Sequence, residues 1–592
     1  MKQFFKIMFA TIFGLVLTMV LVVVMIVAVA IASKDDVEVK ENSVLRLTLQ
    51  GPIKDRAPEG SFKDFDFTKM QPSKSLGLNE ILDNIEKAKN DESIKGIYLD
   101  ISTLNAGYAT AHEIREALLD FKVGGDSGKW IVCYSEALSQ KAYYLASVSN
   151  EIYLNPQGGI QLMGMASTTA FLTGALKKLD IDAQIIRHGK FKSAVEPFML
   201  DSMSPANRKQ TEQYVFSIWD DVVNEISESR SISAEKINTI ADSMWLNNAA
   251  DALERGFVDK LFYKDEAVAA LRDRLGVEDE DEEISFISLA RYNGVAKKAV
   301  DDENSIKREK VAIIYAQGSI VSGKGEDDEI GSETIAKAIA SARENEKVKA
   351  IVLRVNSGGG SALASDVMLR EMQLAKEVKP VVVSMGDVAA SGGYYIACMA
   401  DTIVANRTTI TGSIGVLGVI FNMKDFFKNK LGVSFDGVRS NSHADLGAPT
   451  RPLTEGEKMV IQKEVVRIYD VFITHVSKGR TLSKAVVDSI GQGRVWSGAD
   501  ALDHRLVDVF GGLNDAVEIA AAMAGMENYK ILELPEIESS PLDEILTGMS
   551  DDAESRFLQN KLGAHYRQYL LLEHLLKSQG VQAIVPYDLN LE

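Results

Sequence analysis

The sequence contains very little cysteine. Its 592 residues include only Cys133 and Cys398, too few for a disulfide framework or for the paired cysteine spacing of a structural zinc site. Both lie in apolar stretches, so we expect two buried free thiols and no bridge between them. The sequence thus excludes a small disulfide-stabilised fold, and it predicts neither a metal nor a cofactor.

An excess of positive charge is also absent. The chain has 65 lysines and arginines against 84 aspartates and glutamates, a net charge of -19. Nucleic acids and anionic membrane surfaces attract basic proteins, so we expect no nucleic-acid partner and a solvated acidic surface. The hydrophobic share of 46% is typical of globular proteins. At roughly 100 to 200 residues per domain, the length predicts three or more domains or a repeated unit.

A histidine-based serine site is missing as well. The seven histidines are scattered along the chain, and Thr411 stands where a Gly-x-Ser-x-Gly elbow would have its first glycine. What is present is Gly412-Ser413-Ile-Gly415. A hydroxyl between glycines is open to a substrate carbonyl, because the neighbouring backbone carries no obstructing side chains. A serine without histidine needs another base, which directs the search to lysine.

Charge is absent from one long apolar run, residues 7–32. At about 1.5 Å per residue, a helix of this length spans more than a hydrocarbon core of about 30 Å. We therefore expect a transmembrane anchor within residues 1–34 that contacts the lipid bilayer through residues 7–32. A cleavable signal peptide is the alternative, because Ala28-Val-Ala30 resembles a cleavage site, but its apolar region would be only about 7 to 15 residues long.

The chain is internally duplicated. The repeated segments are short apolar runs, typical of buried parallel strands, and each half then continues into a helix. Ser204-Pro205 predicts the start of one helix, and the capping box Thr454-Glu-Gly-Glu457 predicts the start of the other. Strands alternating with helices indicate an α/β fold with two tandem modules. The paired segments are 44–53 with 311–320, 95–101 with 349–355, and 152–155 with 403–406.

The repeat also predicts the domain boundaries. The acidic run 278–283 separates the two halves, and the tail after about residue 540 has no counterpart in the first half. Residues 557–577 show the periodicity of an amphipathic helix. The expected organisation is a transmembrane anchor at 1–34, a first module at 43–275, an acidic and polar linker at 276–310, a second module at 311–540 and a helical extension at 541–592.

The halves differ where chemistry is expected. The second half has Asn356-Ser-Gly-Gly-Gly-Ser361 at a strand end where the first half has no such glycines. Its free backbone N–H groups suit either an oxyanion hole or a tight turn. Ser413 falls opposite Leu162 of the first half. Ser391 is a rival nucleophile, although we favour a helix N-cap there, because serine is common before a helix start.

Lysine shows the opposite distribution. The first half has Gly189-Lys-Phe-Lys-Ser-Ala-Val-Glu-Pro197, whereas the aligned segment 440–449 has no lysine. Lys192 is either a solvated surface residue or the missing base. Because the first half lacks the serine and the glycine turn and the second half lacks the lysine, we favour a composite site to which both modules contribute. An unperturbed lysine has a pKa of about 10.4, which burial can lower by several units. A neutral Lys192 would deprotonate Ser413 and return the proton to the leaving amine.

Four motifs together resemble the long, membrane-anchored bacterial signal peptide peptidases of the SppA type. The resemblance implies tandem Clp-protease/crotonase-like modules, with Ser413 as nucleophile and Lys192 as general base. It also implies a homotetramer at the bacterial inner membrane, with its catalytic part on the periplasmic side, that hydrolyses signal-peptide remnants. The motifs are Lys192-Ser-Ala-Val-Glu-Pro197, Arg354-Val-Asn-Ser-Gly-Gly-Gly-Ser361, Ala390-Ser-Gly-Gly-Tyr394 and Thr411-Gly-Ser-Ile-Gly415.

One position departs from this family. Gly358 stands where the family often has proline, so a looser turn is expected, although the following glycines remain. By analogy with Clp protease, the oxyanion donors would be the N–H of Gly359 or Gly360 and the N–H of Ile414.

Three functions remain open from the sequence. The leading one is a membrane-anchored serine endopeptidase that cuts short apolar peptides. A crotonase-like acyl-CoA enzyme would share the fold and the glycine turn, and CoA binding would identify it. A catalytically silent membrane scaffold would show no labelling of Ser413 by a serine-reactive probe. It also stays open whether Lys192 serves Ser413 of its own chain or of a neighbour.

Overall fold

The computed structural model describes most of the chain between residues 39 and 536. The predicted anchor at 7–32, apart from residue 14, and the predicted helix at 557–577 lie outside the described residues. Among the residues that are described, none of the helices combines the length and the apolar character needed to cross a membrane. The described residues are 6, 14, 39–57, 65–66, 71–72, 75–124, 128–277, 283–295, 308–326, 328–536 and 582–584.

The first half forms a parallel sheet whose strand order is β10-β8-β7-β6-β1-β11. Its central strands are apolar and buried, as expected for a parallel sheet covered by helices. Helices α2 (Leu78–Lys89) and α3 (Tyr108–Val123) contribute to the same core. The strands are β1 (Ser43–Leu47), β6 (Ile94–Asp100), β7 (Trp130–Ser135), β8 (Glu151–Leu154), β10 (Lys260–Leu261) and β11 (Phe286–Ser288).

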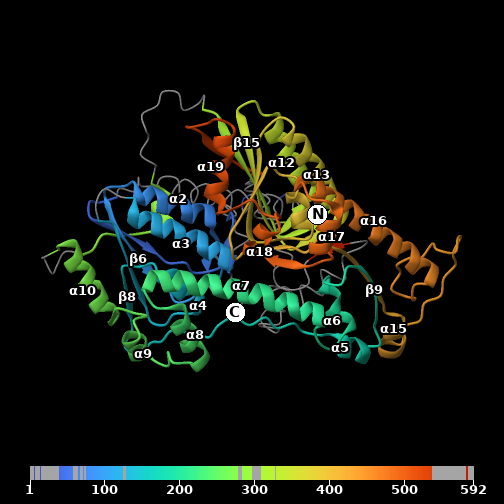
Figure 1. Cartoon of the computed structure of the whole chain (residues 1–592), viewed down its shortest axis with the longest axis horizontal. Coiled ribbons are helices and arrows are strands. Elements are labelled where there is room, and N and C mark those ends of the chain that lie inside the picture. Colours follow the sequence, from blue (N-terminus) through green and yellow to red (C-terminus); the bar gives the residue numbers. More distant parts are fainter. Residues whose placement is uncertain are drawn as a thin grey trace.

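The second half repeats this order as β22-β18-β17-β15-β12-β23. The corresponding pairs are again parallel. The predicted α/β duplication is therefore confirmed, and Figure 1 shows the two halves side by side. The strands are β12 (Lys310–Gln317), β15 (Val348–Ser357), β17 (Val381–Ala390), β18 (Thr402–Ala405), β22 (Val509–Phe510) and β23 (Lys530–Leu534).

The two predicted helix starts are confirmed. Helix α7 (Pro205–Arg230) begins after Ser204, whose hydroxyl accepts a hydrogen bond from a first-turn N–H. Helix α16 (Glu455–Gly479) begins with the predicted capping box at Thr454. Figure 1 shows α7 running across the lower half of the molecule, above α8 and α5, and α7 contacts β21 (Val495–Ser497) of the second half.

A third, smaller sheet combines strands from both halves. Its order is β14-β13-β16-β24-β20-β9. Strand β9 (Asp182–His188) pairs antiparallel with β20 (Val416–Asn422) over the whole length of both strands. This ladder brings the segment that follows His188 close to the segment that precedes Val416, so the lysine and serine motifs meet. The remaining strands are β13 (Ser319–Val321), β14 (Glu329–Gly331), β16 (Gly359–Ser361) and β24 (Gln582–Ile584).

The segment predicted as a linker at 276–310 is partly a structural element of the first half. Strand β11 extends the first sheet by pairing with β1, and helix α11 (Leu289–Asn293) follows it directly. Ile287, Leu289 and Tyr292 are buried in the first core. The prediction was wrong for this stretch because the strong charge on both sides of it masked a short apolar strand.

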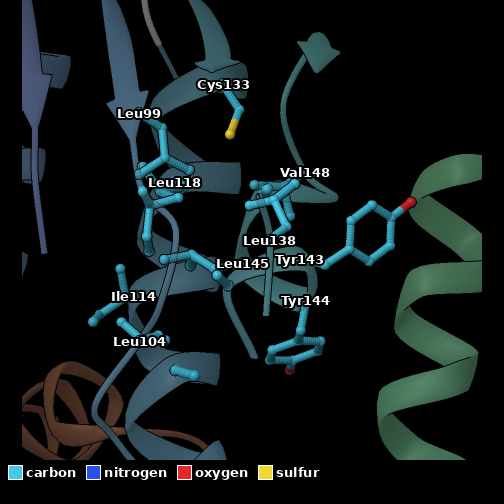
Figure 2. Close-up of a cluster of buried hydrophobic side chains, with 14 of the residues drawn as sticks. Leu99, Leu104, Ile114, Leu118, Cys133, Leu138, Tyr143, Tyr144, Leu145 and Val148 are labelled. Carbon is cyan, nitrogen blue, oxygen red and sulfur yellow. The ribbon is translucent and has the colours of Figure 1, made fainter. Parts of the chain in front are cut away.

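The core of the first half includes one of the two cysteines. Figure 2 shows Cys133 near Leu99 and Leu118 within a cluster of apolar side chains. Cys133 and Cys398 are both free and buried, as predicted. Burial raises the pKa of both thiols, so they stay protonated and unreactive at neutral pH.

A buried arginine joins the two halves. Arg354 of β15 is fully buried, and its Nε donates to Asp55 Oδ1 at 2.8 Å while its Nη2 donates to Glu113 Oε1 at 2.7 Å. Nη1 donates to Ser384 Oγ at 2.8 Å. Asp55 and Glu113 belong to the first half, and both are buried. The positive charge of the guanidinium balances the negative charges of the two carboxylates, whose burial without a partner would cost much free energy.

We expect Arg354→Met to lower the thermal stability strongly. Removing the cation leaves two buried carboxylates without their partner, and breaking a buried pair in this way costs about 3 to 5 kcal/mol. The matched control is Lys89→Met, which breaks the more exposed pair with Asp120 and costs less than about 1 kcal/mol. Thermal unfolding followed by circular dichroism compares them. Equal melting temperatures for the two variants would contradict the linking role of Arg354.

Candidate active site

The Lys192 segment is fixed by helix α7. Lys192 lies between β9 and the short helix α6 (Glu196–Met199). From α7, the buried Gln210 donates through Nε2 to Phe191 O at 3.2 Å and to Ser193 Oγ at 2.8 Å. The N–H of Val495 in β21 donates to the Oε1 of the same glutamine at 3.2 Å. One buried amide thus ties the lysine segment to the second half.

Ser391 lies at the junction of strand β17 and helix α14 (Gly392–Ala397). Its backbone has φ 55° and ψ -113°, a conformation that a residue with a side chain seldom adopts. Ser391 occupies the N-cap position, but its side chain makes no capping hydrogen bond. The favoured N-cap interpretation is therefore wrong, and the hydroxyl points to another partner.

Ser413 follows strand β19 (Ile410–Gly412), with φ 48°. Strands β17 and β19 pair in parallel with Ala390 opposite Gly412, so the two candidate serines follow paired positions of adjacent strands. The N–H of Ser391 donates to Gly412 O at 2.9 Å. This pairing brings together two serines that are far apart along the chain.

The amine of Lys192 lies between these serines. Its Nζ is 2.7 Å from Ser391 Oγ, 3.0 Å from Ser413 Oγ and 3.2 Å from Ser413 O. All three residues have no solvent exposure. The structure thus brings together Lys192, Ser413 and Ser391 within one chain, which answers the question that the sequence left open.

Burial also changes the pKa of the Lys192 amine. Removing the amine from water disfavours its charged form, and it lowers the pKa of Lys192 well below its usual value. A lower pKa increases the fraction of the amine that is neutral, and only a neutral nitrogen can accept a proton.

Two glycines of β16 lie close to Gly392, the residue that follows Ser391. A Cβ added to Gly392 would lie 3.1 Å from Gly359 Cα and 3.1 Å from Gly360 N. The N–H of Gly392 belongs to the first turn of α14, where N–H groups have no acceptor within the helix. The N–H of Gly359 is already engaged, since it donates to Ser357 Oγ at 3.1 Å. Of the two glycines predicted as donors in β16, Gly359 thus has its N–H engaged, and the nitrogen of Gly360 lies close to Gly392.

The third predicted donor, Ile414, belongs to the segment of the other serine. Ile414 is fully buried next to Ser413, and its carbonyl accepts a hydrogen bond from Gly493 N at 2.7 Å. Ile414 therefore helps to hold the segment around Gly493 against the serine loop.

The structure adds Gly493 to the residues found from the sequence, and it gives Gly415 a second role. Gly493 has φ 81°, and a Cβ there would lie 2.5 Å from Lys192 Cβ. A Cβ on Gly415 would lie 3.2 Å from Lys192 Cδ. Both glycines thus allow the backbone to close around the lysine stem. Comparing the halves near Trp496 and Trp245 would have found Gly493, because the first half has no glycine at the aligned place.

We expect Gly493→Ala to reduce peptidase activity by about 100-fold or more, because a displacement of about 1 Å at a catalytic group can cost that much. The control is Gly525→Ala, at φ 69° with no atom within 4 Å of the added Cβ. That change introduces similar backbone strain, on the order of 1 kcal/mol, without crowding the lysine. Initial rates on an apolar fluorogenic peptide distinguish the two, and equal losses would contradict the role of Gly493.

Comparison with known proteins identifies the class. Protease 4 of Salmonella typhi is 37% identical over 482 residues, covering 80% of this chain and 76% of that protein. Serine protease SPPA, chloroplastic, of Arabidopsis thaliana is 34% identical over 556 residues, covering 92% and 78%. A relative in Enterococcus faecium that carries the name of a signal peptide peptidase, SppA, is 36% identical over 177 residues, covering 30% and 51%. The chain is a serine protease.

The family follows from a match in both halves. The sequence profile of peptidase family S49 matches residues 125–278 and again residues 373–527. The chain belongs to peptidase family S49. This membership favours the peptidase over the acyl-CoA enzyme and the silent scaffold that the sequence left open.

Proposed function

We propose that this serine protease is a membrane-anchored endopeptidase in which Lys192 is the general base and Ser391 the nucleophile. The observation that carries the proposal is the fully buried Lys192 amine within 2.7 Å of the Ser391 hydroxyl. The sequence favoured Ser413 for the nucleophile, and that assignment is the alternative. Three features support Ser391.

The first is the hydrogen-bond arrangement around the amine. A neutral lysine amine has two N–H donors and one lone pair. Ser413 offers two acceptors, its carbonyl at 3.2 Å and its hydroxyl oxygen at 3.0 Å. The Ser413 hydroxyl can itself donate to Gly493 O at 3.5 Å. Ser413 therefore suits both donors, and the lone pair is left for the proton of Ser391.

The second feature is the backbone at Ser391. A nucleophilic serine often lies on a strained turn between a strand and a helix, with the N–H of the next residue in the oxyanion hole. Ser391 lies between β17 and α14 with positive φ, and Gly392 follows it. Strain of this kind persists where the surrounding structure enforces it, and it clusters at functional sites.

The third feature is the position of the glycines. Gly392 directly follows Ser391 in the chain, and a Cβ built on Gly392 would lie 3.1 Å from Gly360 N. We assign the N–H groups of Gly392 and Gly360 as the two donors that stabilise the oxyanion.

The mechanism follows from these assignments. Lys192 Nζ takes the proton of Ser391 Oγ as this oxygen attacks the peptide carbonyl carbon, and the carbonyl oxygen becomes an anion held by the two N–H groups. Lys192 then gives the proton to the leaving amine, and the C–N bond breaks to leave an acyl-enzyme on Ser391. A water molecule repeats the sequence and releases the acid. Ser413 keeps the amine aligned through both steps.

The proposal extends to substrate and location. Short apolar peptides, including the remnants of cleaved signal peptides, are the proposed substrates, and the name of the Enterococcus faecium relative supports this class. Residues 7–32 anchor the chain in the inner membrane, with the catalytic modules at 43–275 and 311–540 on the periplasmic side. The assembly is a homotetramer of Clp-protease/crotonase-like modules. The uncharged run at 7–32 supports the anchor, and the doubled family match supports the tandem modules.

A serine-reactive fluorophosphonate probe tests the function. We expect the full-length protein to hydrolyse an apolar fluorogenic peptide and to carry one probe adduct, located on Ser391 by tandem mass spectrometry. An adduct on Ser413 would move the nucleophile to that residue. The absence of both adduct and hydrolysis, together with a thermal shift on adding CoA, would favour the acyl-CoA enzyme.

A further inference from the structure

The turn at residues 491–494, just before β21, contacts both the lysine segment and the serine segment. The N–H of Phe191, next to the catalytic lysine, donates to Gln492 O at 3.0 Å. The N–H of Ser413 donates to Arg494 O at 2.7 Å. The 491–494 turn is therefore hydrogen-bonded to the lysine segment on one side and to the serine segment on the other.

The side chain of Arg494 lies between two aromatic rings. Its Cζ is 4.0 Å from the centroid of the Trp496 ring and 4.9 Å from the centroid of the Phe191 ring. A cation within about 6 Å of the centre of an aromatic ring is attracted to the electrons on its face. Trp496 belongs to β21, whereas Phe191 directly precedes Lys192. The guanidinium thus links the residue beside the base to the second half.

The guanidinium of Arg494 has few polar partners. Its Nη2 donates to Gln213 Oε1 at 2.5 Å, and its Nε is buried with no hydrogen-bond partner among the described residues. Burial lowers the pKa of Arg494, and the carboxylate of Asp500 offsets only part of this effect. A partly buried cation that bonds a neutral amide is unfavourable by itself, so the two ring faces supply much of its stabilisation.

The Lys192 amine has its lowered pKa because it is removed from water. A contact that keeps water out therefore controls its basicity. The other ionisable side chains near the lysine segment have partners of their own. They are Arg187, whose Nη1 donates to Lys192 O at 3.4 Å, Lys190, which is exposed above the Phe191 ring, Glu196, which accepts from Ser204, and Tyr469, which donates to Asp488 and stacks on His188.

We propose that Arg494 is a positioning residue for the Lys192 base: its guanidinium, held between two rings, fastens the lysine segment to the 491–494 turn and keeps water from the amine. The proposal rests on the proposed function, in which Lys192 is the general base. Arg494 acts through Lys192 and not on the substrate. Without the stack the lysine segment loosens, water reaches the amine, and the pKa of Lys192 rises toward its usual value.

The full-length Arg494→Met variant tests the proposal through the pH profile of kcat/KM on an apolar fluorogenic peptide. Methionine keeps a long apolar side chain and removes the cation. Because only neutral Lys192 is active, a higher pKa moves the acid limb of the profile upward, by about one pH unit. Below the transition kcat/KM falls about tenfold, since about a tenth as much lysine is neutral there. The plateau at high pH stays near that of the wild type.

Two further variants accompany Arg494→Met. Arg407→Met is the matched control, because Arg407 also joins the halves, with its Cζ 4.7 Å from the Phe510 ring and its Nε donating to Asp221 Oδ1 at 2.8 Å. These partners lie outside the lysine segment and the 491–494 turn, so we expect the wild-type profile. Arg494→Lys keeps a cation near the rings but loses the planar stack, so its acid limb is expected between those of Arg494→Met and the wild type.

Hydrogen–deuterium exchange with mass spectrometry tests the stack without activity. The N–H groups of Phe191 and Ser193 are hydrogen-bonded, to Gln492 O at 3.0 Å and to Phe191 O at 2.7 Å. We expect them to exchange about tenfold faster in Arg494→Met and at the wild-type rate in Arg407→Met. An unmoved acid limb, an equal loss at every pH or unchanged exchange would overturn the role of Arg494. A wild type that hydrolyses no peptide would instead overturn the proposed function, and the exchange rates would still report on the stack.

Discussion

Ser391→Ala is expected to abolish peptide hydrolysis, whereas Ser413→Ala is expected to leave a measurable fraction. Removing the nucleophile of a serine protease lowers kcat on the order of 10⁶-fold. Ser413 holds the Lys192 amine through its hydroxyl at 3.0 Å and through its carbonyl at 3.2 Å. Alanine keeps the carbonyl, so the loss is that of one hydrogen bond, about 1 to 3 kcal/mol or about 10- to 100-fold. Steady-state rates on one fluorogenic peptide measure both variants.

The control for this pair is Ser147→Ala. Ser147 is another buried serine, and its hydroxyl donates to Tyr144 O at 2.7 Å, in the core of the first half. Removing the Ser147 hydroxyl tests whether the loss of any buried serine lowers the rate of peptide hydrolysis by destabilising the protein. We expect Ser147→Ala to keep nearly wild-type turnover. The reverse result, in which Ser413→Ala is inactive and Ser391→Ala keeps a large part of the activity, would show that Ser413 is the nucleophile.

Lys192→Met is expected to reduce kcat by about 10² to 10⁴-fold, the usual contribution of general acid–base catalysis. In the wild type, the lysine accepts a proton only when it is neutral. Activity is therefore lost as the pH falls through the pKa of Lys192 and reaches a plateau above it. Because burial lowers this pKa well below its usual value, the plateau should begin far below pH 10. The pH profile of kcat/KM measures the transition.

Two further variants check that the ionisation belongs to Lys192. Lys192→Arg places a permanently charged group at the site, so we expect no activity at any pH. Lys190→Met removes a neighbouring exposed lysine whose amine stacks on the Phe191 ring, and we expect it to retain the wild-type profile. A low-pH transition that persists in Lys192→Met would assign the ionisation to another group.

The candidate site was found only in part from the sequence. Comparing the two halves singled out Lys192, Ser413 and Ser391 from hundreds of other residues, because each lies where the halves differ. The N-cap interpretation of Ser391 failed because the same position before a helix serves both a capping serine and a strained nucleophile. The two differ in φ and ψ, which the residue type does not fix.

Gly392 and Gly493 were overlooked for a related reason. A glycine in a sequence shows that a side chain is absent, but not which groups come close to the backbone. The contact of Gly493 with Lys192 joins segments from different halves. The third sheet, which pairs β9 with β20, helps to bring them together.

The amino-acid sequence by itself determined the duplication, the α/β pattern and the types of residue that carry the chemistry, because hydrophobic periodicity, capping residues and differences between repeats are local along the chain. The tertiary structure alone brought the hydroxyls of Ser391 and Ser413 to the amine of Lys192 and buried that amine, which lowers its pKa. These depend on distances of a few ångströms and on exclusion of water, which arise only when distant segments pack together.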